Sequence, residues 1–75
     1  MPRMTKLPVL SGVKVIKALT RFGYQVTDQK GSHVHLKHPT RKPLTVPNHK
    51  EVARGTLKRI INDAGLTIEA FLKHL

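Results

Sequence analysis

The segment "YQVTDQKGSHVHLKH" (residues 24–38) decides the fold, because apolar and polar side chains alternate along it on both sides of a Lys-Gly-Ser turn. A period of two is typical of strands that bury one face and expose the other. A shorter alternating run, "LTV" (residues 44–46), follows a second turn, "PTRKP". These runs predict an antiparallel meander of three strands. Its expected apolar face consists of Tyr24, Val26, Val34, Leu36, Leu44 and Val46.

Helical spacing of apolar residues appears on both sides of the meander. The segment "GVKVIKALTRFG" follows Ser11, a typical N-cap residue, and ends at Gly23. After the meander, "GTLKRIINDAG" (residues 55–65) is helical in pattern, and Thr67 caps a final short helix, "IEAFLKHL". We therefore predict an α+β fold of two layers, with helices on one face of the sheet and a polar, open second face.

Length and composition narrow the possible functions. A chain of 75 residues is expected to form one domain, residues 1–75, with residues 1–10 as an extended lead-in. A domain of this size buries only about 60% of its unfolded surface, so we expect no deep pocket and no cofactor. The chain has no cysteine, which excludes disulfides and thiol catalysis. Neither a signal peptide nor a membrane span is visible, and a soluble, cytoplasmic protein with no membrane partner is expected.

Charge is the strongest compositional signal. Fourteen Lys and Arg residues against four Asp and Glu residues give a formal net charge of +10. Such an excess indicates a polyanionic partner, nucleic acid first and an acidic protein second. A membrane surface ranks third, because no basic amphipathic helix is long or apolar enough to lie in an interface.

Residues 29–39 carry three of the five histidines: His33, His35 and His38. Strand alternation predicts that His33 and His35 face solvent on the open face, while His38 lies at the strand end. One interpretation is a metal site, with His38 or His49 adding a ligand to the His-x-His pair. Asp28 is the nearest carboxylate and the surface is cationic, so we expect no metal.

Two other interpretations of the histidines remain. They are polar surface residues without a further role, which we prefer for His35, His38 and His74; His49 is a turn residue or part of the basic surface. Alternatively, His33 performs acid–base chemistry, because it is the first strand residue after a glycine turn and an imidazole titrates near neutrality. Beside a phosphodiester held by cations, it could deprotonate a ribose 2′-hydroxyl or protonate the leaving oxygen.

Three segments, taken in order, resemble the HicA family of toxin endoribonucleases: "KLPVLSGVKVIKALTRFGYQV", "QKGSHVHLKHP" and "TVPNHKEVARGTLKRIINDAGLTIEAF". The resemblance runs from Lys6 to Phe71. It implies a fold like that of double-stranded-RNA-binding domains and cleavage of mRNA without a ribosome or a metal. It also implies neutralisation by a HicB antitoxin. The family's catalytic histidine in Gly-Ser-His corresponds to His33.

With that resemblance, the basic residues and the Gly-Ser turn of the hairpin become candidate RNA contacts. In the hairpins they are Lys30, Gly31, Ser32, Lys37, Arg41 and Lys42; on the helices they are Lys14, Lys17, Arg54 and Lys58. Free N–H groups at the start of the second helix attract anions, although helix capping by Thr56 is the simpler interpretation there. The alternative function is a non-catalytic RNA- or DNA-binding module. A free protein of this size and charge is expected to be monomeric.

Overall fold

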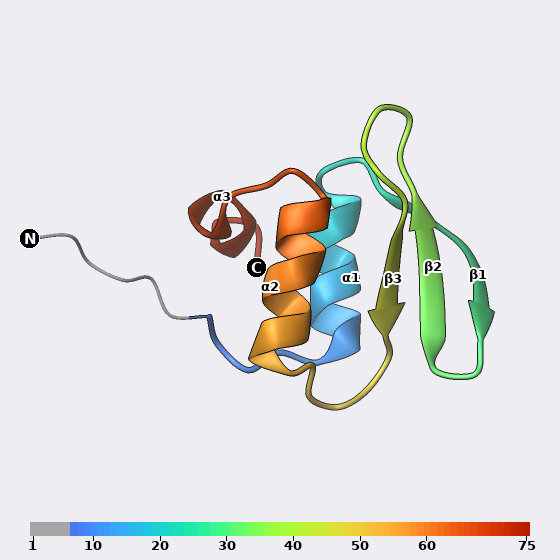
Figure 1. Ribbon diagram of the computed structural model, residues 1–75, viewed down its shortest axis with the longest axis horizontal. Coiled ribbons are helices and arrows are strands. Elements are labelled where there is room, and N and C mark those ends of the chain that lie inside the picture. The colour runs from blue at the N-terminus through green and yellow to red at the C-terminus, as the bar shows by residue number, and fades with distance from the viewer. Residues whose placement is uncertain (1–6) are drawn as a thin grey trace, which may run out of the picture.

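The computed structural model describes residues 7–75, so most of the predicted lead-in lies outside the described residues. The described elements are α1 (Gly12–Thr20), β1 (Gln25–Lys30), β2 (His33–Lys37), β3 (Leu44–Pro47), α2 (Arg54–Asp63) and α3 (Ile68–Leu72) (Figure 1). The predicted order of helix, three strands, helix and short helix is confirmed. None of the helices in residues 7–75 is long and apolar enough to cross a membrane.

The three strands form one antiparallel sheet in the order β1-β2-β3. Helices α1 and α2 pack on β3, and β1 is the strand farthest from them (Figure 1). Exposed and buried residues alternate along β2, which places Val34 and Leu36 under the helices and the polar residues on the other side. This arrangement is α+β in two layers and matches the predicted layout of double-stranded-RNA-binding domains. The core includes Val15, Leu19, Tyr24, Leu36, Val46, Leu57, Ile61 and Phe71.

Helix ends follow the capping residues with one exception. Ser11 accepts a hydrogen bond from the backbone N–H of Lys14, and Thr67 accepts one from Ala70. Gly23 has a φ of 99°, and the Tyr24 N–H reaches the Leu19 carbonyl at 3.3 Å, so the first helix closes in a Schellman motif. The exception is Thr56, for which the capping interpretation is wrong. Helix α2 starts after Ala53 and has no side-chain cap, because Thr56 already lies inside its first turn.

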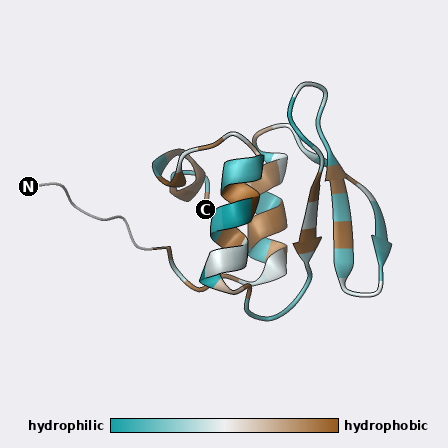
Figure 2. Ribbon diagram, in the orientation of Figure 1, coloured by the Kyte–Doolittle hydropathy of each residue, from teal (hydrophilic) through white to brown (hydrophobic). Residues whose placement is uncertain are grey.

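Val26 corrects the predicted apolar face of the sheet. It pairs with Leu36 and therefore has the alternation of a core residue, yet it is 51% exposed. The reason is that α1 and α2 pack on β3 rather than on β1, and all six residues of β1 are exposed. Figure 2 shows the same contrast, with hydrophobic colour concentrated on the helices, β2 and β3. Alternation predicted the direction of the Val26 side chain but not the extent of helical cover.

The start of α1 is fitted closely against the loop that follows β3. The Gly12 N–H donates to the His49 carbonyl at 2.9 Å. A Cβ atom at Gly12 would lie 2.5 Å from the Pro47 carbonyl oxygen and 2.7 Å from the Asn48 Cα. Because real Cβ contacts are never this short, glycine is required for this approach. The approach brings His49 and its neighbours to the end of the sheet where β2 begins.

Candidate active site

His33 is the first residue of β2 and is exposed on the open face of the sheet. It pairs with Lys30 of β1 on one side and with Pro47 of β3 on the other. Directly opposed residues have Cβ atoms about 4.5–5.5 Å apart, so a lysine stem lies beside the imidazole. The His33 side chain forms no hydrogen bond or ion pair with any residue that the structure describes. Both ring nitrogens are therefore available to a bound molecule.

The turn before His33 is held from two sides. Gln29 Nε2 donates to the Gly31 carbonyl at 2.9 Å, and the Asn48 N–H donates to the Ser32 carbonyl at 2.6 Å. His49 Nε2 lies 3.2 Å from Ser32 Oγ. Gly31 has a φ of 58°, a conformation that suits glycine, and open space around its Cα. The backbone that carries His33 is consequently tied to β1 and to the loop after β3.

His49 is a residue whose position the sequence analysis missed. It was expected in a turn or on the basic surface, and the structure brings it to Ser32, 17 positions away. No local pattern in "VPNH" signals this contact, because it depends on the pairing of β3 with β2. The contact makes His49 a support for the turn that precedes His33.

His35 lies two residues after His33 on the same face and is bonded to a carboxylate. Its Nδ1 lies 2.5 Å from Asp28 Oδ1, with the His35 side chain 37% exposed. The two residues are opposed across β1 and β2, and a shift in strand register between Val26 and Asp28 creates that pairing. They border a shallow depression of about 450 Å³ together with Lys37 and Thr45. The sequence alone predicts His35 as a polar surface residue without a further role.

His38 has a structural role that the sequence analysis did not assign. Its Nε2 donates to the Phe22 carbonyl at 2.8 Å, and its Nδ1 accepts from the N–H groups of Thr40 and Arg41, each at 3.0 Å. This pattern of donor and acceptor corresponds to a neutral imidazole with the proton on Nε2. The ring also packs on Tyr24, with centroids 4.9 Å apart. His38 therefore organises the loop between β2 and β3.

Tyr24 also stabilises the end of the sheet at which His38 lies. Its hydroxyl donates to the Lys42 carbonyl at 2.8 Å. Burial raises the pKa of Tyr24 above its ordinary value of 10.0, while the Arg41 charge lowers it and the Asp63 carboxylate raises it. The phenol is therefore held in its neutral form.

The predicted RNA contacts fall into separate groups. Lys30, Gly31, Ser32 and Lys37 lie on the β1–β2 hairpin with His33. Two arginines are bonded to backbone: Arg41 Nη1 reaches the Ala64 carbonyl at 2.8 Å, and Arg54 Nε reaches the Leu7 carbonyl at 2.8 Å. Lys42 lies 3.8 Å from an Asp63 carboxylate oxygen. Arg41 and Lys42 thus connect the loop after β2 to the end of α2, and Arg54 connects the start of α2 to Leu7.

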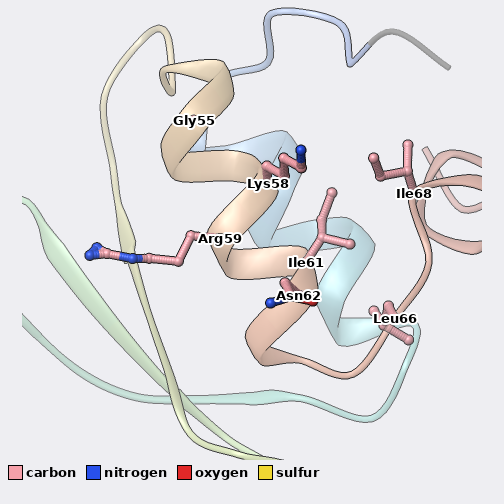
Figure 3. A pocket seen from close by; sticks show the side chains of 7 residues that line it. All are labelled: Gly55, Lys58, Arg59, Ile61, Asn62, Leu66 and Ile68. Atoms are coloured by element: carbon pink, nitrogen blue, oxygen red, sulfur yellow. The ribbon is translucent and has the colours of Figure 1, made fainter. Parts of the chain in front are cut away.

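The remaining basic candidates belong to the helical layer. Lys14 and Lys17 border a depression with Arg21, next to the C-terminal residues His74 and Leu75. Lys58 borders a groove of about 440 Å³ between α2 and α3, and Arg59 leaves α2 in a different direction (Figure 3). The structure thus separates the hairpin cations near His33 from the basic residues of the helices, which border two different depressions. No group of three His, Cys, Asp or Glu residues within residues 7–75 could hold a metal ion.

Comparison with protein families gives one match. Residues 12–66, more than half of the chain, match the family described as the HicA toxin of bacterial toxin–antitoxin systems. Comparison with curated proteins finds no significant match. The matched residues span α1, the whole sheet and α2, and they include the Gly-Ser-His turn that carries the exposed imidazole. The chain therefore belongs to the HicA family of toxins.

Proposed function

We propose that this toxin is an endoribonuclease that cleaves mRNA without a ribosome and without a metal ion. His33 acts as a general acid or general base. The observation that carries the proposal is the state of this imidazole, which is exposed at the start of β2, opposite Lys30, with neither nitrogen bonded to any of residues 7–75. A single acid or base placed in this way contributes roughly 10²–10⁴ in rate, so cleavage does not require a deep pocket.

In the proposed reaction, the RNA supplies its own nucleophile, the ribose 2′-hydroxyl. The ribose 2′-oxygen attacks the adjacent phosphorus as its proton leaves to a base, and the bond from phosphorus to the 5′-oxygen breaks. That 5′-oxygen takes up a proton from an acid. The products are a 2′,3′-cyclic phosphate and a 5′-hydroxyl end, so one proton is removed and one is supplied. An imidazole at His33 suits either role, because the ring accepts a proton when neutral and donates one when charged.

The RNA backbone is held by the cations of the open face. Lys30 lies opposite His33 on β1, Lys37 is the last residue of β2, and the N–H groups of the Gly31–Ser32 turn are directly before His33. Each lysine that neutralises a phosphate releases counterions, so replacing Lys30 by Ala should reduce the dependence of affinity on salt by about one unit of slope. Arg41 and Arg54 are not free for this task, because their guanidinium groups already bind backbone carbonyls.

We also propose a HicB-type antitoxin as the protein partner. The open face of the sheet combines the candidate active site with exposed lysines, so an acidic protein bound there would block RNA and neutralise charge together. The free toxin is monomeric and acts in the cytoplasm, where mRNA is its substrate. Binding of HicB and RNA to the same face predicts competition between them.

The deciding experiment compares wild type with His33→Ala in protein treated with a chelator and freed of metal. Wild type should cleave RNA and leave cyclic phosphate ends, and His33→Ala should lose cleavage while keeping its fold and most of its RNA affinity. An RNA with a 2′-deoxy sugar at the cleavage position should resist the wild type. A requirement for a divalent ion, or equal cleavage of the deoxy substrate, would exclude the proposed reaction.

A second candidate is a non-catalytic RNA- or DNA-binding module. It is favoured by the basic surface of α1, where Lys14, Lys17 and Arg21 gather away from His33. Under this alternative, purified protein binds nucleic acid in a salt-dependent way but never cleaves it. Replacing Lys14 and Lys17 would then weaken binding more than replacing Lys30 and Lys37.

A further inference from the structure

A second imidazole on the open face, that of His35, is oriented by the carboxylate of Asp28. We propose that His35, held by Asp28, is the general base of the proposed RNA cleavage and that His33 is the general acid. This inference rests on the endoribonuclease function proposed above and assigns the two proton transfers of that reaction to two residues.

The irregularity in β1 is the first observation that points to His35. Val26 pairs with Leu36, so regular pairing would place Thr27 opposite His35. The register shift inserts an extra residue and places Asp28 opposite His35 instead. Bulges of this kind redirect side chains and are over-represented next to active sites. Here the redirected side chain is one of only four acidic residues in a chain of charge +10.

The hydrogen bond between Asp28 and His35 determines which ring nitrogen of His35 carries the proton. Asp28 Oδ1 lies 2.5 Å from His35 Nδ1, so the proton on Nδ1 points at the carboxylate. In a neutral ring, Nε2 then carries the lone pair and is free to accept a proton. As it accepts one, the carboxylate stabilises the imidazolium that forms. This is the role that an aspartate plays beside the histidine of a hydrolase triad.

The spacing of the two histidines suits one phosphodiester. Residues two apart on a strand project from the same face, with Cα atoms roughly 6.6–6.8 Å apart. A phosphodiester with its phosphorus between the rings would present the 2′-hydroxyl of the preceding ribose to His35 and the leaving 5′-oxygen to His33. The 2′-proton passes to His35 Nε2 as the new bond from oxygen to phosphorus forms. The imidazolium of His33 gives its proton to the 5′-oxygen as the old bond breaks.

Neighbouring groups complete the environment of His35. Asp28 faces it from β1, Thr45 faces it from β3, and Lys37 and His33 flank it along β2. Asp28, Lys37 and Thr45 border the depression beside His35, which gives the ribose or base of the attacking nucleotide a place to lie. His33 does not border that depression, in agreement with its assignment to the leaving-group side.

The test uses His35→Gln and Asp28→Asn, each with a matched control elsewhere in the fold. His74→Gln removes an imidazole that packs on Phe22, and Asp63→Asn removes the carboxylate next to Lys42, raising the net charge by the same one unit as Asp28→Asn. We expect His35→Gln to lower kcat/KM by about 10²-fold or more. Asp28→Asn should cause a loss of about tenfold, which corresponds to about 1.4 kcal/mol of transition-state stabilisation. Both controls should retain wild-type cleavage.

The pH profile and a modified substrate separate the two roles. A base must be unprotonated and an acid protonated, so wild type should show a bell-shaped profile of kcat/KM. His35→Gln should lose the fall at acidic pH, and His33→Ala should lose the fall at alkaline pH. An RNA with sulfur in place of the leaving 5′-oxygen needs no proton donor, so it should restore cleavage by His33→Ala and leave His35→Gln impaired.

Defined results would overturn the assignment. If His35→Gln cleaves within twofold of wild type and keeps both limbs of the profile, His35 is not the base. If the sulfur substrate rescues His35→Gln rather than His33→Ala, the two roles are reversed and the assignment fails. Wild type that cleaves no RNA would reject the endoribonuclease function itself, whereas active wild type with normal His35→Gln rejects only this inference.

Discussion

A histidine lies at the start of β2 and another just past its end, and the two differ in exposure and in hydrogen bonding. At the start of the strand, His33 is exposed and its ring nitrogens have no partner among the described residues. Just past the other end, both nitrogens of His38 are bonded to backbone groups, and its ring packs on Tyr24. A histidine with filled hydrogen bonds cannot exchange protons without breaking the loop it holds. The unfilled histidine is the one available for chemistry.

The largest effect that tests this contrast is the loss of activity in His33→Ala. Cleavage should fall by about 10²–10⁴-fold, or roughly 3–5 kcal/mol of barrier, because one proton transfer loses its catalyst. The melting temperature should stay close to that of wild type, since the His33 side chain forms no hydrogen bond or ion pair with any of residues 7–75. Activity and thermal unfolding measured on the same preparation would check both. A large drop in melting temperature would show that His33 also has a structural role.

The opposite substitution, His38→Ala, should lower stability. It leaves the Phe22 carbonyl and the N–H groups of Thr40 and Arg41 without their partner, which costs about 1–3 kcal/mol. Urea unfolding at neutral pH measures the loss. Cleavage per folded molecule should remain near that of wild type, because His38 lies at the far end of the strand from His33. If stability is unchanged and cleavage falls, the comparison between the two ends is wrong.

The support of the His33 end can be weakened through Gly12. Gly12→Ala places a Cβ atom 2.5 Å from the Pro47 carbonyl oxygen, which is backbone and cannot rotate away. The loop after β3 must shift, at a cost of about 1–3 kcal/mol in the free energy of unfolding.

Gly55 in α2 offers the matched control for that substitution. A Cβ atom there meets no atom of residues 7–75 within 4 Å, so Gly55→Ala should stabilise the helix by about 0.5–1 kcal/mol. Urea unfolding of both variants checks the pair. Equal effects from the two substitutions would contradict the close fit of α1 against the loop.

The smallest effect concerns Tyr24 at the His38 end and appears at alkaline pH. Because the folded pKa of Tyr24 is raised above 10.0, its contribution is complete below pH 10 and is lost as pH rises through the folded pKa. Tyr24→Phe should cost about 1 kcal/mol at pH 7 through the lost hydrogen bond to the Lys42 carbonyl. Above pH 10, the difference in stability between wild type and variant should shrink. A constant difference up to pH 11 would argue against the raised pKa.

Local sequence patterns were sufficient for the elements and for the direction of the side chains. Alternation in residues 24–38 placed His33 and His35 on the open face, and Ser11 and Thr67 cap the helices as predicted. Local patterns gave the wrong prediction for one helix cap and for one core residue. Thr56 resembles a cap but lies inside α2, and Val26 resembles a core residue but lies on an uncovered edge strand.

The composition of this chain determined its charge and its small core. The alternating pattern determined its open sheet face, and the Gly-Ser-His turn indicated His33. Only the tertiary structure decided which polar residues are free. In the folded protein, Arg41 and Arg54 donate to distant carbonyls. His49 contacts Ser32, and Asp28 contacts His35. The physical reason is that side-chain direction follows from local backbone periodicity. Hydrogen bonds between distant residues depend on strand register and on how the layers pack.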